Sequence, residues 1–106
     1  MTSATVSEDA ERTARIVNPR GLHARPAGRF VALAKQFSAR VRVRCRGDEV
    51  DGRSILSLLM LEAVQGTHLI LVARGPDAVE AVEALAELIA QGFDEQWSWE
   101  SRGARG

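Results

Sequence analysis

The sequence predicts an α+β fold, an open-faced sandwich in which a four-stranded antiparallel sheet carries three helices on one face (β-α-β-β-α-β-α). Three observations predict it. The 106 residues suffice for one domain with its own core. Strand and helix patterns interleave along the chain, and the stretch "ARVRVRCR" places four arginines on one side of a strand. Because such a face cannot be core, we expect one side of the sheet to face solvent.

The first strand and the first helix flank a loop. "RTARIV", residues 12–17, suits a short strand, and the polar residues 1–11 before it are expected to form a loose tail. "NPRG" marks a loop because Asn, Pro and Gly favour turns. From Pro26 a helix is predicted, with proline in the first turn, where its missing N–H has no intrahelical acceptor. Its apolar stripe consists of Ala27, Phe30, Leu33, Ala34 and Phe37.

Three more strands complete the predicted sheet. In residues 39–46 the apolar side chains of Val41, Val43 and Cys45 alternate with the arginines. "GDE" is typical of a tight turn into a short strand, "EVD", so the two strands should form a hairpin. "HLILVAR", residues 68–74, is apolar enough to be a central strand.

The last helix is predicted in "GPDAVEAVEALAELIAQGF", where turn residues and an acidic first turn precede the helix and Gly92 ends it. The expected inward residues are Val79, Val82, Leu85, Ala86 and Ile89. We therefore expect one domain over residues 12–95, followed by a tail, residues 96–106, that contains Trp97 and Trp99.

Composition narrows the function classes. The net charge is zero, so no overall field attracts nucleic acid or membrane, although residues 12–53 hold 11 basic and three acidic residues. The single cysteine, Cys45, allows no internal disulfide and no thiolate metal cluster. The first residues lack the pattern of a secretory signal, and no apolar run is long enough to span a bilayer. A cytoplasmic protein without membrane insertion is expected.

The stretch "SILSLLMLEA", residues 54–63, is too apolar for a helix that lies on a sheet. Its apolar side chains, at Ile55, Leu56, Leu58, Leu59, Met60 and Leu61, cover more than half of a helical wheel. A helix on a sheet buries one stripe, so some of these side chains should be exposed, and exposed apolar clusters often dock partners. The alternative is that neighbouring elements cover them.

His23 is the candidate reactive residue. It precedes the amino end of a predicted helix, where unpaired N–H groups and the helix dipole favour an anion. Arg25 adds a guanidinium suited to phosphate oxygens, and Gly21 permits a sharp turn before the histidine. These parts suit a histidine that accepts a phosphoryl group, with Ala24, Pro26 and Ala27 forming the phosphate-binding helix start.

Simpler interpretations of the histidines stay open at this point. A lone histidine near a helix start is often a polar cap or a surface residue. His68, the other histidine, begins a strand, and neither histidine has a carboxylate cluster beside it, so we expect no metal site and no cofactor. No glycine-rich nucleotide loop and no Ser-His-Asp order is present.

Two sequence motifs favour one interpretation of His23 over the others. "GLHARPA" followed by "GRSILSLLML" and "AVQGT" resembles the HPr family, the histidine-containing phosphocarriers of the bacterial phosphoenolpyruvate-dependent phosphotransferase system, over roughly Thr13 to Phe93. The resemblance implies that His23 is phosphorylated at Nδ1 by enzyme I, which phosphoenolpyruvate charges, and passes the group to a IIA-type component. It implies that Arg25 stabilises the phosphate. The implied docking residues are Leu22, Arg29, Ile55, Leu56, Leu59 and Met60.

The resemblance also implies a regulatory position. Ser54 falls where many members carry a serine that a dedicated kinase (an HPr serine kinase/phosphorylase) phosphorylates, and it is also a predicted N-cap, which needs no regulation to explain it. "LLMLEAVQG", with Glu62, looks nearer to the regulatory, nitrogen-type branch than to the sugar branch.

Three functions therefore compete. The first is a phosphocarrier, most simply a monomer, that is not a turnover enzyme and serves sugar uptake or a nitrogen-type branch. The second is a regulatory binding module controlled by phosphorylation at Ser54. The third is nucleic-acid binding by Arg40, Arg42, Arg44 and Arg46. We do not expect the third, because no aromatic residue interleaves with the arginines and Glu49 and Asp51 can pair across the strands.

Overall fold

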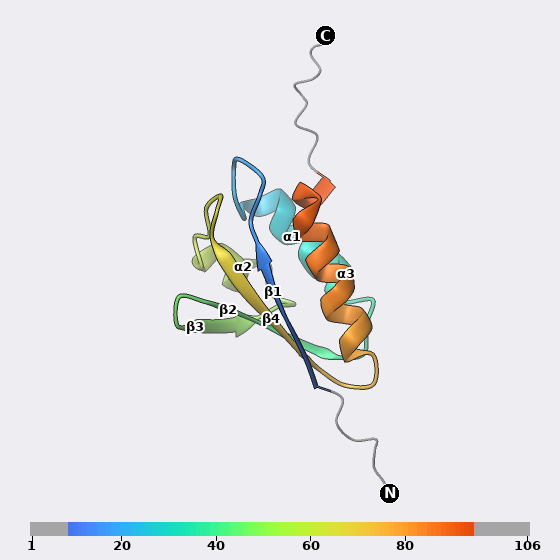
Figure 1. Cartoon of the computed structure of the whole chain (residues 1–106). Coiled ribbons are helices and arrows are strands. Elements are labelled where there is room, and N and C mark those ends of the chain that lie inside the picture. Colours follow the sequence, from blue (N-terminus) through green and yellow to red (C-terminus); the bar gives the residue numbers. More distant parts are fainter. Residues whose placement is uncertain (1–8, 95–106) are drawn as a thin grey trace, which may run out of the picture.

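The computed structural model describes residues 9–94 and has the predicted architecture (Figure 1). The elements in order are β1 (Asp9–Arg15), α1 (Ala24–Ala34), β2 (Arg40–Cys45), β3 (Asp48–Asp51), α2 (Ile55–Met60), β4 (His68–Arg74), α3 (Ala78–Ala90) and a short 3-10 helix, η2 (Gly92–Asp94). The strands form one antiparallel sheet in the order β1-β4-β2-β3, with the helices on one face. The predicted fold class is confirmed. Trp97, Trp99 and most of the predicted tails lie outside the described residues.

Strand alternation gives the sheet one covered face and one open face. The covered face is built by alternate residues of β2 and β4, all of them buried: Val41, Val43, Cys45, Leu69, Leu71 and Ala73. On the open face the register places Arg42 opposite Val72 and Arg44 opposite Ile70. The alternation predicted for β2 and the central place of β4 are therefore confirmed.

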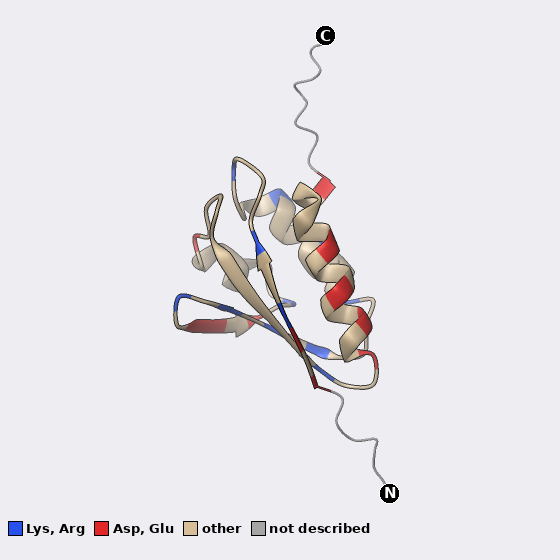
Figure 2. Ribbon diagram, in the orientation of Figure 1, with Lys and Arg blue, Asp and Glu red and all other residues tan. Residues whose placement is uncertain are grey.

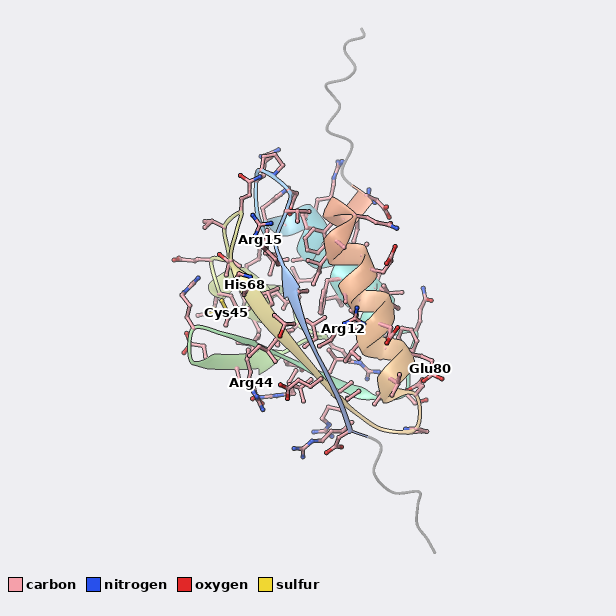
Figure 3. All side chains as sticks on the ribbon, viewed as in Figure 1. Arg12, Arg15, Arg44, Cys45, His68 and Glu80 are labelled. Atoms are coloured by element: carbon pink, nitrogen blue, oxygen red, sulfur yellow. The ribbon has the colours of Figure 1, made fainter. Side chains whose placement is uncertain are left out.

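The arginines of the open face are partly neutralised by a neighbouring strand. Glu49 on β3 accepts hydrogen bonds from Arg44 Nε at 2.8 Å and from Arg42 Nε at 3.0 Å. The hydrogen bond from Arg44, and after it that from Arg42, lowers the pKa of the Glu49 carboxyl. Figure 2 shows the basic residues of β2 beside the acidic residues of β3, and Figure 3 labels Arg44. The expected cross-strand pairing is confirmed for Glu49.

The first strand begins earlier than predicted. The sequence predicts a strand over residues 12–17 and a tail over residues 1–11, whereas β1 runs over Asp9–Arg15 and so begins three residues earlier and ends two residues earlier. Seven residues of β1 pair with β4, and Ala10 packs against the core. The polar start was misleading because β1 is an edge strand, where Asp9 can face solvent and meet Arg74 at 3.7 Å.

The helices bury most of the predicted inward residues, with three corrections. α1 ends at Ala34, so Phe37, predicted for its apolar stripe, follows the helix, and both Leu33 and Phe37 are half-buried against the core. α1 begins at Ala24, so Pro26 is its third residue rather than its first. In α3 the inward positions include Ala78 and Ala81, while Val79, which was predicted to point inward, is 58% exposed. The error has a simple cause: the small alanines pack closest to the sheet, and the larger valine between them falls on the solvent side of the helical wheel.

An acidic residue at the start of α3 joins two loops at one end of the sheet, where β2 begins and β4 ends. Asp77 accepts hydrogen bonds from the backbone N–H groups of Ser38, at 2.8 Å, and Ala39, at 2.7 Å. The hydrogen bond from Ser38 is the main reason that the pKa of the Asp77 carboxyl is lowered. The side chain thereby ties the loop before β2 to the loop before α3.

Candidate functional site

The loop that leads to His23 is shaped by a buried asparagine. Asn18 is fully buried, and its Nδ2 donates to the carbonyl oxygen of Gly21 at 2.9 Å. The Gly21 N–H in turn donates to the carbonyl oxygen of Asn18 at 3.1 Å. Gly21 has φ +71°, a left-handed conformation that side chains other than glycine adopt at a cost. The turn before the histidine is therefore specified by "NPRG" as a unit.

The segment that follows α2 supports the same loop from the other side. The Leu22 N–H donates to the carbonyl oxygen of Ala63 at 2.9 Å, and the Gly66 N–H donates to that of Ile16 at 2.7 Å. Gln65 Nε2 also donates to the carbonyl oxygen of Val17 at 3.0 Å. A Cβ at Gly21 would lie 2.5 Å from the carbonyl oxygen of Ala63, so only glycine fits at this contact.

His23 is the N-cap residue of α1. Its backbone is extended, with φ −90° and ψ −168°, and its carbonyl oxygen accepts the first helical hydrogen bond, from Ala27 N–H at 2.9 Å. The side chain is half-buried, so the ring is held at the surface. By helix geometry the amides of Ala24 and Arg25 have no intrahelical acceptor, and Pro26 has no N–H to satisfy. The ring therefore stands at the positive end of the helix, as predicted.

The charge at this helix end favours an incoming anion. The first turn of α1 contains no acidic residue, and the exposed Arg25 adds a positive charge where the helix dipole is already positive. Like charges at a helix start are unfavourable by about 0.3–1 kcal/mol. A bound dianion would reverse the sign of that interaction, so the arrangement suits a site that is negatively charged for part of its working cycle.

The other residues predicted for the helix start have separate positions. Ala24 is exposed, whereas Pro26 and Ala27 are buried and anchor the first turn to the core. Leu22 was predicted to dock partners, but only 4% of it is exposed. That prediction is wrong: the leucine enters the core because its backbone is bonded to Ala63 beneath the loop.

α2 is shorter than predicted, and Ser54 begins it. The helix covers Ile55–Met60 rather than residues 54–63, and Ser54 Oγ accepts the Ser57 N–H at 3.1 Å. The N-cap prediction is confirmed. The helix ends early because Glu62 has φ +51°, which turns the chain toward Ala63 and the site loop.

The expected apolar exposure of this helix is confirmed. The exposed fractions are 42% for Ile55, 69% for Leu56 and 72% for Met60, while Leu59 is half-buried against the core. Val64, directly after the segment predicted as a helix, is 65% exposed and was not singled out from the sequence. We call these four exposed side chains, Ile55, Leu56, Met60 and Val64, the α2 patch.

The α2 patch continues onto α1. A Cβ at Gly28 would lie 4.0 Å from Ile55 Cδ1, so Ile55 packs beside this part of α1. Arg29, the next residue and a predicted docking residue, is exposed and lies 3.9 Å from Asp94 between Nη1 and Oδ2. Because Arg25 and Arg29 are four residues apart, they share one side of the helix. His23, Arg25 and Arg29 therefore lie at or on α1, and the α2 patch lies on the neighbouring helix, which contacts α1 through Ile55.

The second histidine lies elsewhere. His68 starts β4 opposite Arg15 of β1 (Figure 3) and is exposed. It lines a shallow hollow of about 380 Å³ with Thr13, Ile70 and Arg44, whose guanidinium is engaged by Glu49. Within residues 9–94 no group of three or more His, Cys, Asp or Glu side chains is placed to hold a metal ion, and no helix there is long and apolar enough to cross a membrane.

Comparisons with known proteins assign the family. A sequence profile described as "PTS HPr component phosphorylation site" matches residues 10–91. The phosphocarrier protein HPr of Pseudomonas aeruginosa is 46% identical over 81 residues, 76% of this chain and 90% of that protein. The phosphocarrier protein NPr of Escherichia coli (strain K12) is 38% identical over 86 residues, 80% of this chain and 96% of that protein. The crystal structure of HPr-C-His from Thermoanaerobacter tengcongensis superposes with a TM-score of 0.78 at 40% identity, over 82% of this chain and 98% of that one.

Fold and sequence together define a small phosphocarrier of the phosphotransferase system. The chain belongs to the HPr family. Members of this family interact with the enzymes of that system, which sets the general kind of partner.

Proposed function

We propose that this chain carries a phosphoryl group on Nδ1 of His23, receiving it from the phosphohistidine of enzyme I and delivering it to a histidine of a IIA-type component. The carrier is a reactant in both steps and not a turnover enzyme. We propose further that the protein is cytoplasmic and monomeric, and that it serves either sugar uptake or a nitrogen-type regulatory branch of the phosphotransferase system. The observation that carries it is the position of His23 as the half-buried N-cap of α1, two residues before an exposed arginine.

The transfer step balances without a cofactor. The lone pair of His23 Nδ1 attacks the phosphorus of the donor phosphohistidine, and a nitrogen–phosphorus bond forms as the donor's own nitrogen–phosphorus bond breaks. The donor imidazole keeps the electron pair of the broken bond and takes up a proton, while His23 gives up the proton of its other ring nitrogen, Nε2, so that protons are conserved. Delivery to the acceptor histidine is the same exchange in the opposite direction, so one site serves both halves of the cycle.

The helix start would stabilise the carried group. Phosphoryl transfer needs little covalent help from a protein and depends on positioning and charge stabilisation. The amides of Ala24 and Arg25 would donate to the phosphate oxygens, and the Arg25 guanidinium would add a charge-assisted hydrogen bond. These donors are fixed by the fold, so they need little reorganisation when the group arrives.

The α2 patch and the neighbouring arginines would form the docking surface. Both enzyme I and the acceptor must reach the same histidine in turn, so each complex has to be small and short-lived. An apolar centre of Leu56 and Met60 gives contact area that does not depend on one exact partner shape. Arg25 and Arg29 would favour acidic partner surfaces and speed the encounter.

Labelled phosphoenolpyruvate tests the assignment. Incubated with enzyme I and this label, the wild-type protein should gain acid-labile, base-stable phosphate. His23→Ala should gain none, and the matched control His68→Ala, which removes the exposed histidine of β4, should be labelled like wild type. Label that persists in His23→Ala, or that vanishes in His68→Ala, would refute the assignment to His23.

Arg25→Ala tests the electrostatic role of the guanidinium. A hydrogen bond to a charged group contributes about 1.5–3 kcal/mol, so transfer should slow by about 10- to 100-fold. The fold should be unchanged because Arg25 is exposed, which far-ultraviolet circular dichroism checks. Arg74→Ala, an exposed arginine on the sheet, is the control and should transfer at the wild-type rate. Equal rates for the two variants would contradict the proposed role.

Ser54 is the proposed position of regulation. It is half-buried, caps α2 and precedes the exposed Ile55 and Leu56, so a phosphate there would bring negative charge to the edge of the docking surface. A kinase would then switch docking without touching His23. If the chain acted mainly as a regulatory binding module, partner binding would depend on Ser54 phosphorylation and would survive in His23→Ala.

A further inference from the structure

The carbonyl oxygen of Gly21 accepts two hydrogen bonds in the loop between β1 and α1, at the top of Figure 1. One comes from Nδ2 of Asn18, at 2.9 Å, and the other from the backbone N–H of His23, at 3.0 Å. A carbonyl oxygen has two lone pairs, so these two donors fill its capacity. Asn18 therefore shares an acceptor with the proposed phosphoryl carrier.

The same oxygen is the acceptor that α1 would use if the helix began earlier. The first hydrogen bond of α1 runs from the Ala27 N–H to the His23 carbonyl oxygen. In an α-helix each N–H bonds to the carbonyl four residues earlier, so the acceptor for the Arg25 N–H would be Gly21. Because Asn18 and His23 already occupy that acceptor, the Arg25 N–H stays available to an anion at the helix start.

Neither core packing nor the turn calls for a side-chain amide at Asn18. Within residues 9–94 it is the only buried polar or charged side chain, and burying an amide costs free energy that an apolar side chain of similar size, such as leucine, avoids. The turn is closed by backbone groups, since the Gly21 N–H donates to the carbonyl oxygen of Asn18 at 3.1 Å. What the side chain adds is the hydrogen bond to the Gly21 carbonyl oxygen.

We propose that Asn18 is a positioning residue of the phosphoryl site, which keeps the Arg25 N–H available for the phosphate by donating to the Gly21 carbonyl oxygen. Its side chain is buried, so it acts through Gly21 and Arg25 rather than on the phosphate itself. The effect on phosphoryl transfer rests on the proposed function. The state of the Arg25 N–H, by contrast, can be measured in the unphosphorylated protein.

Amide hydrogen exchange measured by NMR tests the state of the Arg25 N–H. In wild type it should exchange much faster than the Ala27 N–H, which is bonded to His23. In Asn18→Leu the Gly21 oxygen has a free lone pair, and one backbone hydrogen bond is worth about 2- to 10-fold in an equilibrium constant. The Arg25 N–H should therefore be bonded for most of the time and exchange about 3- to 11-fold more slowly. A protected Arg25 N–H in wild type, or equal exchange in both proteins, overturns the proposal.

The kinetics of phosphoryl transfer from enzyme I test the effect on the reaction. Only molecules with a free Arg25 N–H can offer it to the phosphate, so the kcat of Asn18→Leu should fall by the same factor, about 3- to 11-fold. The KM should stay at the wild-type value, because the α2 patch and the bond from Leu22 to Ala63 are unchanged. Should circular dichroism show that Asn18→Leu does not fold, Asn18→Ala removes the same donor with a smaller side chain and has the same expected values. A KM that rises while kcat holds assigns Asn18 to docking and overturns the proposal.

Gln65→Leu is the matched control. Gln65 Nε2 donates to another carbonyl of the same loop, that of Val17, at 3.0 Å, so this variant weakens the loop without freeing the Gly21 oxygen. It should keep the wild-type exchange rates and the wild-type kcat. Equal losses in Gln65→Leu and Asn18→Leu would show that any weakening of the loop slows transfer, which overturns the role of Asn18. A wild-type protein that gains no label from enzyme I would refute the proposed function instead.

Discussion

Replacing Gly21 by alanine tests whether the site loop is held as the structure shows. An alanine must adopt the same left-handed conformation, φ +71°, at a cost of about 1–2 kcal/mol. Its Cβ must also displace the carbonyl oxygen of Ala63, 2.5 Å away, and overpacking of this kind costs about 1–3 kcal/mol. The lower entropy of alanine in the unfolded chain returns about 0.4–1 kcal/mol. The expected net loss is about 1–5 kcal/mol.

Gly47→Ala supplies the matched control. Gly47 also has a positive φ, +90°, but no atom lies within 4 Å of the place where its Cβ would be. Gly47→Ala should lower the free energy of unfolding only through the cost of the left-handed conformation. After the stabilisation from the lower entropy of the unfolded chain is subtracted, the loss should be within about 1 kcal/mol. Thermal unfolding followed by circular dichroism should separate the variants by roughly 8–16 °C for a difference of about 2 kcal/mol. Equal melting temperatures for Gly21→Ala and Gly47→Ala would refute the close approach to Ala63.

Two further substitutions test the caps and the loop contacts. Asp77→Asn removes a carboxylate whose pKa is lowered by the N–H groups of Ser38 and Ala39. The pKa of the Asp77 carboxyl is lower in the folded protein than in the unfolded chain. The carboxylate therefore adds to the free energy of unfolding above about pH 4, and this contribution is lost as the pH falls through the folded pKa. The free energies of unfolding of Asp77→Asn and wild type, measured with urea, should therefore differ at pH 7 and become equal in acid. A difference that stays the same at all pH values would contradict this. Ser54→Ala removes the acceptor of the Ser57 N–H and should cost about 1 kcal/mol, or a melting temperature lower by roughly 4–8 °C. Ser54→Asp, which keeps an acceptor, should melt near wild type, and a loss as large as that of alanine would argue against the cap.

Much of the fold could be predicted because the strand patterns are unambiguous. The alternation around Val41 and Val43 indicates both the buried face and the open one, and the apolar run of β4 indicates its central place. The predictions that failed concern residues whose polarity or size does not indicate which way they face. At the edge strand β1, polar residues such as Glu11 pair as well as apolar ones, and on α3 the small Ala78 is inward while Val79 is not.

The sequence predicts the residues of the candidate site that lie at helix starts, but not the contacts that the site loop makes with distant parts of the chain. His23, Arg25 and Ser54 are adjacent to helix starts, and helix starts have residue patterns that one sequence can reveal. Leu22 was misassigned because burial beneath a loop depends on a contact with Ala63, which is distant in the chain. Asn18 was recognised only as a turn residue, since its inward amide contact with Gly21 has no sequence signature beyond the "NPRG" turn itself.

The hydrogen bonds around Ala63 would hold the proposed phosphoryl-carrying histidine in a fixed position relative to the proposed docking surface. The Leu22 N–H donates to the carbonyl oxygen of Ala63, and the next residue of each segment is His23, the proposed phosphoryl carrier, or Val64 of the α2 patch. A short-lived complex gains little free energy, so ordering a loop or several side chains at each encounter would weaken it considerably. The fold avoids this cost by fixing the distance between ring and patch through backbone groups. Mutations at Gly21 should therefore impair docking and transfer in parallel, because they move the two surfaces relative to each other.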